Sequence, residues 1–318
     1  MGQRSRNQGF TLIELSIVLV VIGLIVGGIL VRQNLINAAA VRATISQIEK
    51  YNTAANTFFG KYGWLPGDIP AGPAAQFGLI ARDNVPGTGD GNGIIEGNYE
   101  DRSGYNHCGT VQLPGETGVF WVDLSTMGLI DGGFTTAANN SYPSTAITAA
   151  TTPGLSSYLP AAKIGASNYI YVWSGSASTD SCGGGNGGVY FGNATNYFAI
   201  SAVTAIGDGG ANVGSLFSNV GLTVSQAYST DTKIDDGLPQ SGRVTAVYLN
   251  NDAYWAGTTN EGAAYTSATP GSSTTCFDNS SAASGTPGVA GAVQHYSVEI
   301  SNGANVTCAL SFRMQAGD

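Results

Sequence analysis

The chain has 318 residues and a formal net charge of −9, and its acidic residues are concentrated in the C-terminal part. Beyond position 63 there are 19 acidic residues against six basic ones, a formal charge of −13. So acidic a region lacks the basic patch that nucleic-acid binding requires, and no nucleic-acid partner is expected. An acidic, lysine-poor surface suits an extracellular protein and attracts divalent cations.

The N-terminus combines a basic, polar leader with a long apolar run. Residues 1–9 read MGQRSRNQG, and the 22 residues 10–31 contain one charged residue, Glu14. As a helix this run would be ~33 Å long, enough to cross a bilayer. An ordinary signal peptide has its cleavage site after the apolar run, whereas here Gly9 precedes it. Cleavage after Gly9 would therefore leave the apolar helix on the mature chain.

The residues GFTLIE, which begin at Gly9, resemble the class III signal of type IV prepilins and type II secretion pseudopilins. The resemblance implies that a prepilin peptidase cuts between Gly9 and Phe10 and methylates the new N-terminus at Phe10. It also implies that mature subunits polymerise through their N-terminal helices, with the help of an inner-membrane assembly platform. The precursor would be a single-pass inner-membrane protein with its N-terminus inside. The assembled filament would be periplasmic or extracellular.

Glu14 needs a charged partner. A carboxylate in a membrane span costs about 2.5–3.5 kcal/mol on insertion scales. Cleavage after Gly9 would create an ammonium group at Phe10, and two unit charges ~4 Å apart attract by roughly 4 kcal/mol at an effective dielectric near 20. The partner is either the chain's own amine or that of a neighbouring subunit; in the resembling family it is the neighbour's, which sets the filament register. The alternative is a plain signal anchor in which Glu14 is incidental.

The N-terminal helix is predicted to continue far beyond the apolar run. Residues 31–59 contain no proline or glycine, and their apolar positions recur mostly at intervals of three and four. These positions are Leu35, Ala38, Val41, Ile45, Ile48, Ala55 and Phe59. Gly63 and Pro66 then favour a helix end. The pattern predicts one long helix that is apolar on one face in its second half.

The chain is therefore expected to have three parts. They are a cleaved leader, 1–9, a spine helix, 10–62, whose first part 10–31 is the transmembrane segment and filament core, and a globular extracytoplasmic head, 63–318. The sequence YGWLPGD at 62–68 extends the resemblance, because pseudopilin-like proteins often end the long helix in a similar turn. The expected class is α+β, a pilin-like spine packed against a large antiparallel β-sheet head.

Alternating apolar residues predict strands in the second half of the head. Residues 294–300 and 306–312 alternate like a pair of strands, and 243–249 reads as another strand. The middle of the head, 135–175, is rich in Thr, Ala, Ser and Pro, which favours surface loops or short strands. These segments predict an antiparallel sheet built from several parts of the chain.

A short helix is predicted after Thr223. Thr223 and Gln226 form a capping-box pattern, which opens a helix. Asp235 and Asp236 lie at its expected end, where the helix dipole disfavours negative charge. This placement points to a cation or to a basic partner such as Arg243, and local ion pairing is the simpler account.

All four cysteines lie in the head. They are Cys108, Cys182, Cys276 and Cys308. In an oxidising compartment an even number indicates two disulfides, with free buried thiols as the alternative. Three pairings are possible, and we favour Cys108–Cys182 with Cys276–Cys308. Closing the shorter loop of about 33 residues would stabilise the fold by roughly 3–4 kcal/mol.

The glycine-rich segment 87–97, GTGDGNGIIEG, is a candidate calcium loop. Asp90, Asn92 and Glu96 offer oxygen ligands, and the intervening glycines permit a tight turn, which are the requirements of calcium. The spacing does not fit an EF-hand. Major pseudopilins of the resembling family carry a calcium loop in the head. A plain Asp/Asn/Gly turn is the alternative, and it is the simpler account of the same residues.

Enzymatic activity is not expected. None of the motifs GxSxG, HExxH or GxxxxGK[ST] occurs, and nothing in the spacing of Glu116, Asp123 and Asp131 selects a catalytic carboxylate pair. The sequence predicts a structural filament subunit. The alternative is a filament-presented minor pilin or adhesin whose head binds a surface or glycan. Its platform would be supplied by exposed aromatic residues, although aromatics that alternate along strands also fit a core. The candidates are Trp121, Trp173, Tyr169, Tyr171 and Trp255.

Overall fold

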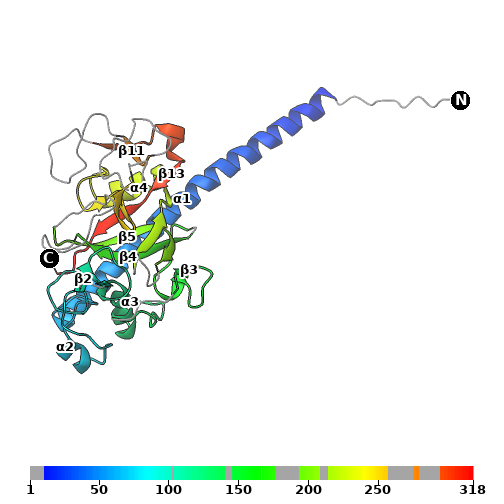
Figure 1. Cartoon of the computed structure of the whole chain (residues 1–318). Coiled ribbons are helices and arrows are strands. Elements are labelled where there is room, and N and C mark those ends of the chain that lie inside the picture. Colours follow the sequence, from blue (N-terminus) through cyan, green and yellow to red (C-terminus); the bar gives the residue numbers. More distant parts are fainter. Residues whose placement is uncertain are drawn as a thin grey trace.

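The structure, a computed structural model, has one long helix that projects from a head of helices and strands (Figure 1). It describes residues 11–101, 104–139, 145–165, 167–175, 193–207, 214–256, 275–278 and 294–317. The long helix, α1, runs from Leu12 to Tyr62 over 51 residues. It ends because Gly63 adopts a left-handed conformation with φ 82°, and its N–H donates to the Phe59 carbonyl at 2.8 Å. The predicted spine helix is confirmed.

The second half of α1 forms one side of the head's core. Val41, Ile48, Ala55 and Phe58 are buried there, at intervals of seven, seven and three residues, which place them on one helix face. Three residues of the predicted apolar stripe were placed wrongly: Leu35, Ala38 and Phe59 are all exposed. The side chain of Leu35 is 66% exposed, because the head begins to cover α1 only at about Val41. Phe59 is 37% exposed, since its neighbour Phe58 occupies the buried face instead.

Three further helices, two short 3-10 turns and fourteen strands make up the described part of the head. The helices are α2 (Ala71–Gln76), α3 (Glu116–Thr126) and α4 (Val224–Ile234), and the turns are η1 (Leu155–Ser157) and η2 (Ile300–Gly303). The strands are β1 (Gly97–Asp101), β2 (Gly104–Cys108), β3 (Ile147–Thr148), β4 (Asn168–Ser174), β5 (Asn196–Ile206), β6 (Leu216–Asn219), β7 (Leu222–Thr223), β8 (Val244–Thr245), β9 (Val247–Asn250), β10 (Asp252–Trp255), β11 (Phe277–Asp278), β12 (His295–Tyr296), β13 (Val306–Cys308) and β14 (Leu310–Arg313). The predicted α+β class is confirmed.

The central sheet is antiparallel and is organised around β5. Strands β3, β4, β6 and β14 all pair with β5, and β8 adds to β14. Ile200 at the centre of β5 lies between Ile170 of β4 and Leu310 of β14, and all three side chains are fully buried. The sheet therefore supplies the second wall of the core, and α1 and α3 contact each other within the same core.

Aromatic residues fill the space between the helices and the sheet. Trp121 on α3 packs edge-on against Tyr51 of α1, with ring centroids 5.0 Å apart. Trp121, Trp173, Tyr171 and Trp255 are each at most 2% exposed. These side chains belong to the core, and the hypothesis that they form an exposed sugar-binding platform was wrong for them.

The predicted pairing of 294–300 with 306–312 was also wrong. Only His295–Tyr296 of the first segment is a strand, and it pairs with β11. The second segment is divided into β13, which pairs with β7, and β14, which pairs with β5 and β8. The predicted strand at 243–249 is present in two pieces, β8 and β9. The predicted capping box is confirmed, since the Thr223 hydroxyl accepts from Gln226 N–H at 3.1 Å.

A disulfide fastens the C-terminal strands. Cys276, just before β11, is bonded to Cys308 of β13, with Cα atoms 4.8 Å apart and both residues fully buried. The structure thus contains this predicted bridge. Cys108 also takes part in a disulfide; its expected partner, Cys182, lies outside the described residues.

Candidate functional site

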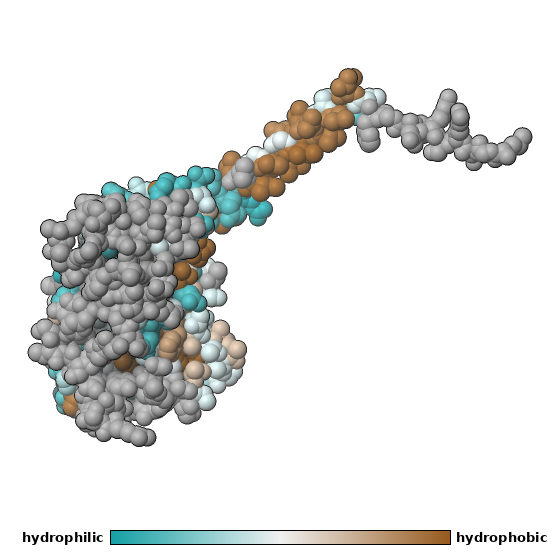
Figure 2. Space-filling model, turned by 45° about the horizontal axis from the view of Figure 1, so that its top comes forward, coloured by the Kyte–Doolittle hydropathy of each residue, from teal (hydrophilic) through white to brown (hydrophobic). Residues whose placement is uncertain are grey.

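The first half of α1 is an uncovered apolar rod. Nearly every large apolar side chain from Leu12 to Ile36 is about half exposed or more. Figure 2 shows the outer part of the projecting helix as hydrophobic and the part next to the head as hydrophilic. None of the most apolar stretch of α1 is buried. By length and composition this helix is able to cross a membrane.

Glu14 lies in the first turn of this rod, where it forms a capping box with Thr11. The Glu14 carboxylate accepts from the Thr11 N–H and hydroxyl, both at 2.8 Å, and the Thr11 hydroxyl accepts from the Glu14 N–H at 3.2 Å. The carboxylate therefore turns back toward the start of the helix. The predicted processing site, Gly9 and Phe10, lies outside the described residues.

The turn that follows α1 is held by a buried ion pair. The Asp123 carboxylate, on α3, accepts from Arg82 Nη2 at 2.7 and 2.8 Å and from the Gly67 N–H at 2.7 Å. Neither charged side chain has exposed surface. Burial raises the pKa of Asp123, while the Arg82 guanidinium opposes that change. This network anchors the YGWLPGD turn. Its three residues are far apart in the sequence, so no local sequence pattern predicts that they interact.

Three carboxylates meet beside the glycine-rich loop. Each of Asp68, Asp90 and Glu116 has an oxygen atom within 4.8 Å of the others, and Asp68 and Glu116 are buried. Asp68 accepts from the N–H groups of Gly91 and Gly93, both at 2.8 Å. The loop can fold so tightly around Asp68 because these glycines adopt φ of +78° and +83°.

Glu116 completes this acidic cluster from the start of α3. It accepts from the N–H of Gly89 at 2.8 Å and of Glu96 at 2.9 Å. Burial raises the pKa of Asp68 to about 7, and burial together with the negative charge of Asp68 raises the pKa of Glu116 well above its usual value. The carboxylates of the cluster repel one another. Binding of a proton, or of a cation that prefers oxygen ligands, would relieve this repulsion.

The predicted calcium ligands are only partly brought together. Asp90 belongs to the cluster, and the Asn92 side-chain amide donates to Asp90 at 3.1 Å. Glu96 contributes its backbone N–H to Glu116, and its own carboxylate is not one of the three clustered groups. The sequence interpretation missed Asp68 and Glu116, although Asp68 lies in the YGWLPGD motif. Calcium binding stays a prediction.

A second acidic group lies at the end of α4. Asp231, Asp235 and Asp236 place oxygen atoms within 4.8 Å of one another. Asp235 accepts from the backbone N–H of Arg243, so the predicted contact is made through the main chain. Asp231 is buried and accepts from the Tyr296 hydroxyl at 2.8 Å, and burial raises its pKa to about 7. These bonds hold the segment after α4 against β8 and β12.

Three carboxylates considered for catalysis have separate roles. Glu116 joins the acidic cluster, Asp123 pairs with Arg82, and Asp131 pairs with Lys50 at 2.5 Å. Each is therefore engaged in a different structural contact. The geometry gives no paired-carboxylate site among these three residues.

Comparison with known proteins identifies the N-terminus. The prokaryotic N-terminal methylation motif matches residues 4–30, which include Glu14 and all but the last residue of the apolar run. Neither the curated proteins nor the solved structures gave a match to this chain. The family of the motif is structural, and with the exposed apolar helix the motif fits a membrane-anchored precursor. The chain thus carries a type IV prepilin-like class III signal peptide at its N-terminus.

Proposed function

We propose that this chain is a structural subunit of a type IV pilus-like or type II secretion pseudopilus filament. The observation that carries the proposal is the methylation motif at the start of an α1 helix whose apolar half projects uncovered from the head. Prepilin peptidase cleaves between Gly9 and Phe10, and the subunits then polymerise through α1. The head, 63–318, lies outside the membrane.

The physical need to cover α1 supports this function. Burying apolar surface stabilises by about 25 cal/mol per Å², so a rod with this many exposed Leu, Ile and Val side chains is not stable in water. Lipid covers it in the inner-membrane precursor, which has its N-terminus inside. Neighbouring subunits, delivered by the membrane assembly platform, cover it in the filament. The same surface thus serves both states in turn.

Glu14 sets the register of this assembly. In the precursor its carboxylate is satisfied by the N–H and hydroxyl of Thr11. Cleavage puts the new ammonium group on Phe10, the residue that precedes Thr11 in the sequence. A neighbour's Phe10 ammonium then attracts the exposed Glu14 carboxylate in an apolar environment, where such attraction is strong.

The test compares Glu14→Ala with Glu49→Ala in cells that express the full chain. Glu49 is an exposed carboxylate on the same helix, so its loss controls for a general change of charge. We expect Glu14→Ala to remove the protein from the sheared surface fraction while the membrane pool remains, and Glu49→Ala to leave both unchanged. Equal filament yields from wild type and Glu14→Ala would contradict the proposal.

The structure weakens the adhesin alternative. Its motivating feature was a set of aromatic side chains on the head, and four of these are buried in the core. Filament presentation and ligand binding remain compatible, because a filament subunit can carry an additional ligand site. The distinguishing experiment is glycan and surface binding by purified filaments, in which specific, saturable binding would favour the adhesin.

A further inference from the structure

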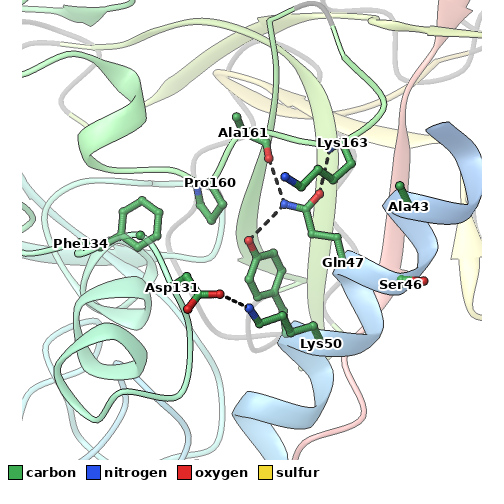
Figure 3. A pocket seen from close by; sticks show the side chains of 11 residues that line it. Ala43, Ser46, Gln47, Lys50, Asp131, Phe134, Pro160, Ala161 and Lys163 are labelled. Atoms are coloured by element: carbon green, nitrogen blue, oxygen red, sulfur yellow. Dashed lines mark hydrogen bonds and ion pairs between the residues drawn. The ribbon is translucent and has the colours of Figure 1, made fainter. Parts of the chain in front are cut away.

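An open groove of about 470 Å³ lies between α1 and the head (Figure 3). One wall is the exposed face of α1 with Ser46 and Lys50, and the opposite walls are the segments 131–134 and 160–163. Phe134 and Pro160 give the lining an apolar part. Figure 3 shows the side chains of Lys50 and Lys163 on the two sides of Gln47.

The groove is held open by Gln47. Its side-chain amide donates to the Ala161 carbonyl at 2.9 Å and to the Tyr51 hydroxyl at 3.2 Å, and its carbonyl oxygen accepts from the Lys163 N–H at 2.9 Å. The bonds to Ala161 and Lys163 fix the 160–163 segment to the spine, and the bond to Tyr51, which also lies on α1, orients the Gln47 side chain. A site whose walls are already fixed loses less entropy when it binds a partner.

The groove has two ammonium groups and one carboxylate. Lys50 pairs with Asp131 at 2.5 Å, but the Asp131 side chain is 95% exposed, and so open an ion pair contributes little and exchanges readily. Lys163 is exposed, and no carboxylate of the described residues lies within ion-pair distance of it. The groove is therefore a positive, partly apolar recess.

The rest of the head has the opposite charge. Lys163 is one of only six basic residues beyond position 63, against 19 acidic ones, and described carboxylates such as Asp83, Asp236 and Glu299 lie at the surface. The chain thus carries both a cationic recess and an anionic surface. A contact between two different patches of the same chain propagates from copy to copy, and an open helical filament is its natural product.

We propose that the groove receives a carboxylate-bearing segment of the head of a second copy of this chain. The proposal rests on the filament function and names a head contact that acts together with α1 packing. The two lysines bind the incoming carboxylate, and Phe134 and Pro160 contact the apolar part of the same segment. Complementary charges also select the orientation of the arriving subunit.

The experiment places a photo-cross-linking amino acid at Ser46 in the full chain. Ser46 is exposed and lines the groove. The control position is Thr232, which is exposed on α4 and does not line the groove. Filaments are sheared from cells, irradiated and analysed by peptide mass spectrometry. The expected product is a cross-link from position 46 to an acidic head peptide of a second copy, with none of this product from position 232.

Charge reversal provides the second arm. Lys163→Glu should lower the yield of the position-46 cross-link by at least about tenfold, since like charges across an interface disfavour the contact by more than 1.4 kcal/mol. Lys233→Glu, an exposed lysine on α4, is the matched control and should leave the yield unchanged. An unchanged yield with Lys163→Glu would overturn the proposal.

The outcomes separate this contact from the filament function. In wild-type filaments, position 46 could cross-link only to a spine helix, only to another protein, or to nothing. Any of these results would overturn the groove contact and leave the filament function intact. A processed wild-type chain that forms no filament would overturn the filament function and this contact together.

Discussion

The Arg82 guanidinium and the Asp123 carboxylate form an ion pair 2.7 Å long inside the head, where neither side chain has exposed surface. Asp123 lies on α3, and its carboxylate also accepts a hydrogen bond from the Gly67 N–H in the turn that follows α1. The pair thus connects the end of α1 with the core of the head. A filament subunit needs this connection to be stiff, because the head is carried by the spine.

Breaking this pair on one side should destabilise the head strongly. Arg82→Met would leave the Asp123 charge buried without its partner, which typically costs about 3–5 kcal/mol. The expected drop in Tm is roughly 6–20 °C for a domain of this size. Circular dichroism of the full chain in detergent, followed through thermal unfolding, measures the change.

The double variant Arg82→Met with Asp123→Leu is the control for that prediction. It removes both charges, so no unpaired carboxylate remains, and it should recover much of the lost stability. The Gly67 N–H still loses its acceptor, and recovery should therefore be incomplete. A double variant as unstable as Arg82→Met alone would show that the buried charge is not the cause.

Calcium should stabilise the acidic cluster near neutral pH. At pH 7.5 Asp68, Asp90 and Glu116 repel one another unless a proton or cation neutralises them. Calcium at about 100 times its Kd would stabilise the folded state by roughly 2.7 kcal/mol. We expect Tm to rise by several degrees with CaCl₂ and to return after chelation by EGTA.

Two variants localise the calcium effect. Asp90→Asn should abolish most of the calcium-dependent rise in Tm, because it removes a charged ligand of the cluster. Glu299→Gln removes an exposed carboxylate elsewhere and should keep the whole rise. If the wild type showed the same Tm with calcium and with EGTA, the predicted site would be wrong.

The stability of the head should fall as pH rises toward neutrality. Asp231 has a pKa raised from 3.8 to about 7 by burial, so between about pH 4 and 7 the folded chain binds a proton that the unfolded chain has released. The stabilisation that Asp231 contributes is therefore fully present below about pH 4 and is lost as pH rises to about 7. Tm measured in EGTA from pH 4.5 to 8 should decline less in Asp231→Asn than in wild type. Parallel curves would refute this role of Asp231.

The Cys276–Cys308 disulfide should stabilise the C-terminal strands. It closes a loop with a sequence separation of 32, for which the chain-entropy model gives roughly 3–4 kcal/mol. Replacing both cysteines with serine should lower the urea concentration at the unfolding midpoint. The central sheet should stay intact, because β14, and not the disulfide-bonded β13, pairs with β5 and β8. An unchanged midpoint would contradict this prediction, because it would mean that the disulfide does not reduce the conformational freedom of the unfolded chain.

Features that depend on neighbouring residues could be predicted from the sequence. The end of α1 follows from Gly63 and its left-handed conformation, and the start of α4 follows from Thr223 and Gln226. The apolar run can be recognised from its composition alone as long enough to cross a membrane. Each of these signals is complete within a few residues, so no knowledge of the tertiary fold is needed.

The remaining features depend on distant parts of the chain. Asp90 could be recognised as a candidate ligand, yet its companions Asp68 and Glu116 come from the turn after α1 and from α3. Arg82 and Asp123 are 41 residues apart, and no local pattern links them. Strand pairing fails for the same reason, since alternation predicts a strand but not its partner.

The most direct test of the filament account is the intact mass and N-terminal sequence of the protein in sheared surface material. The account predicts a chain that begins at N-methyl-Phe10, without residues 1–9. A chain that begins at Met1 and stays in the membrane fraction would contradict it, and α1 would then be a simple membrane anchor.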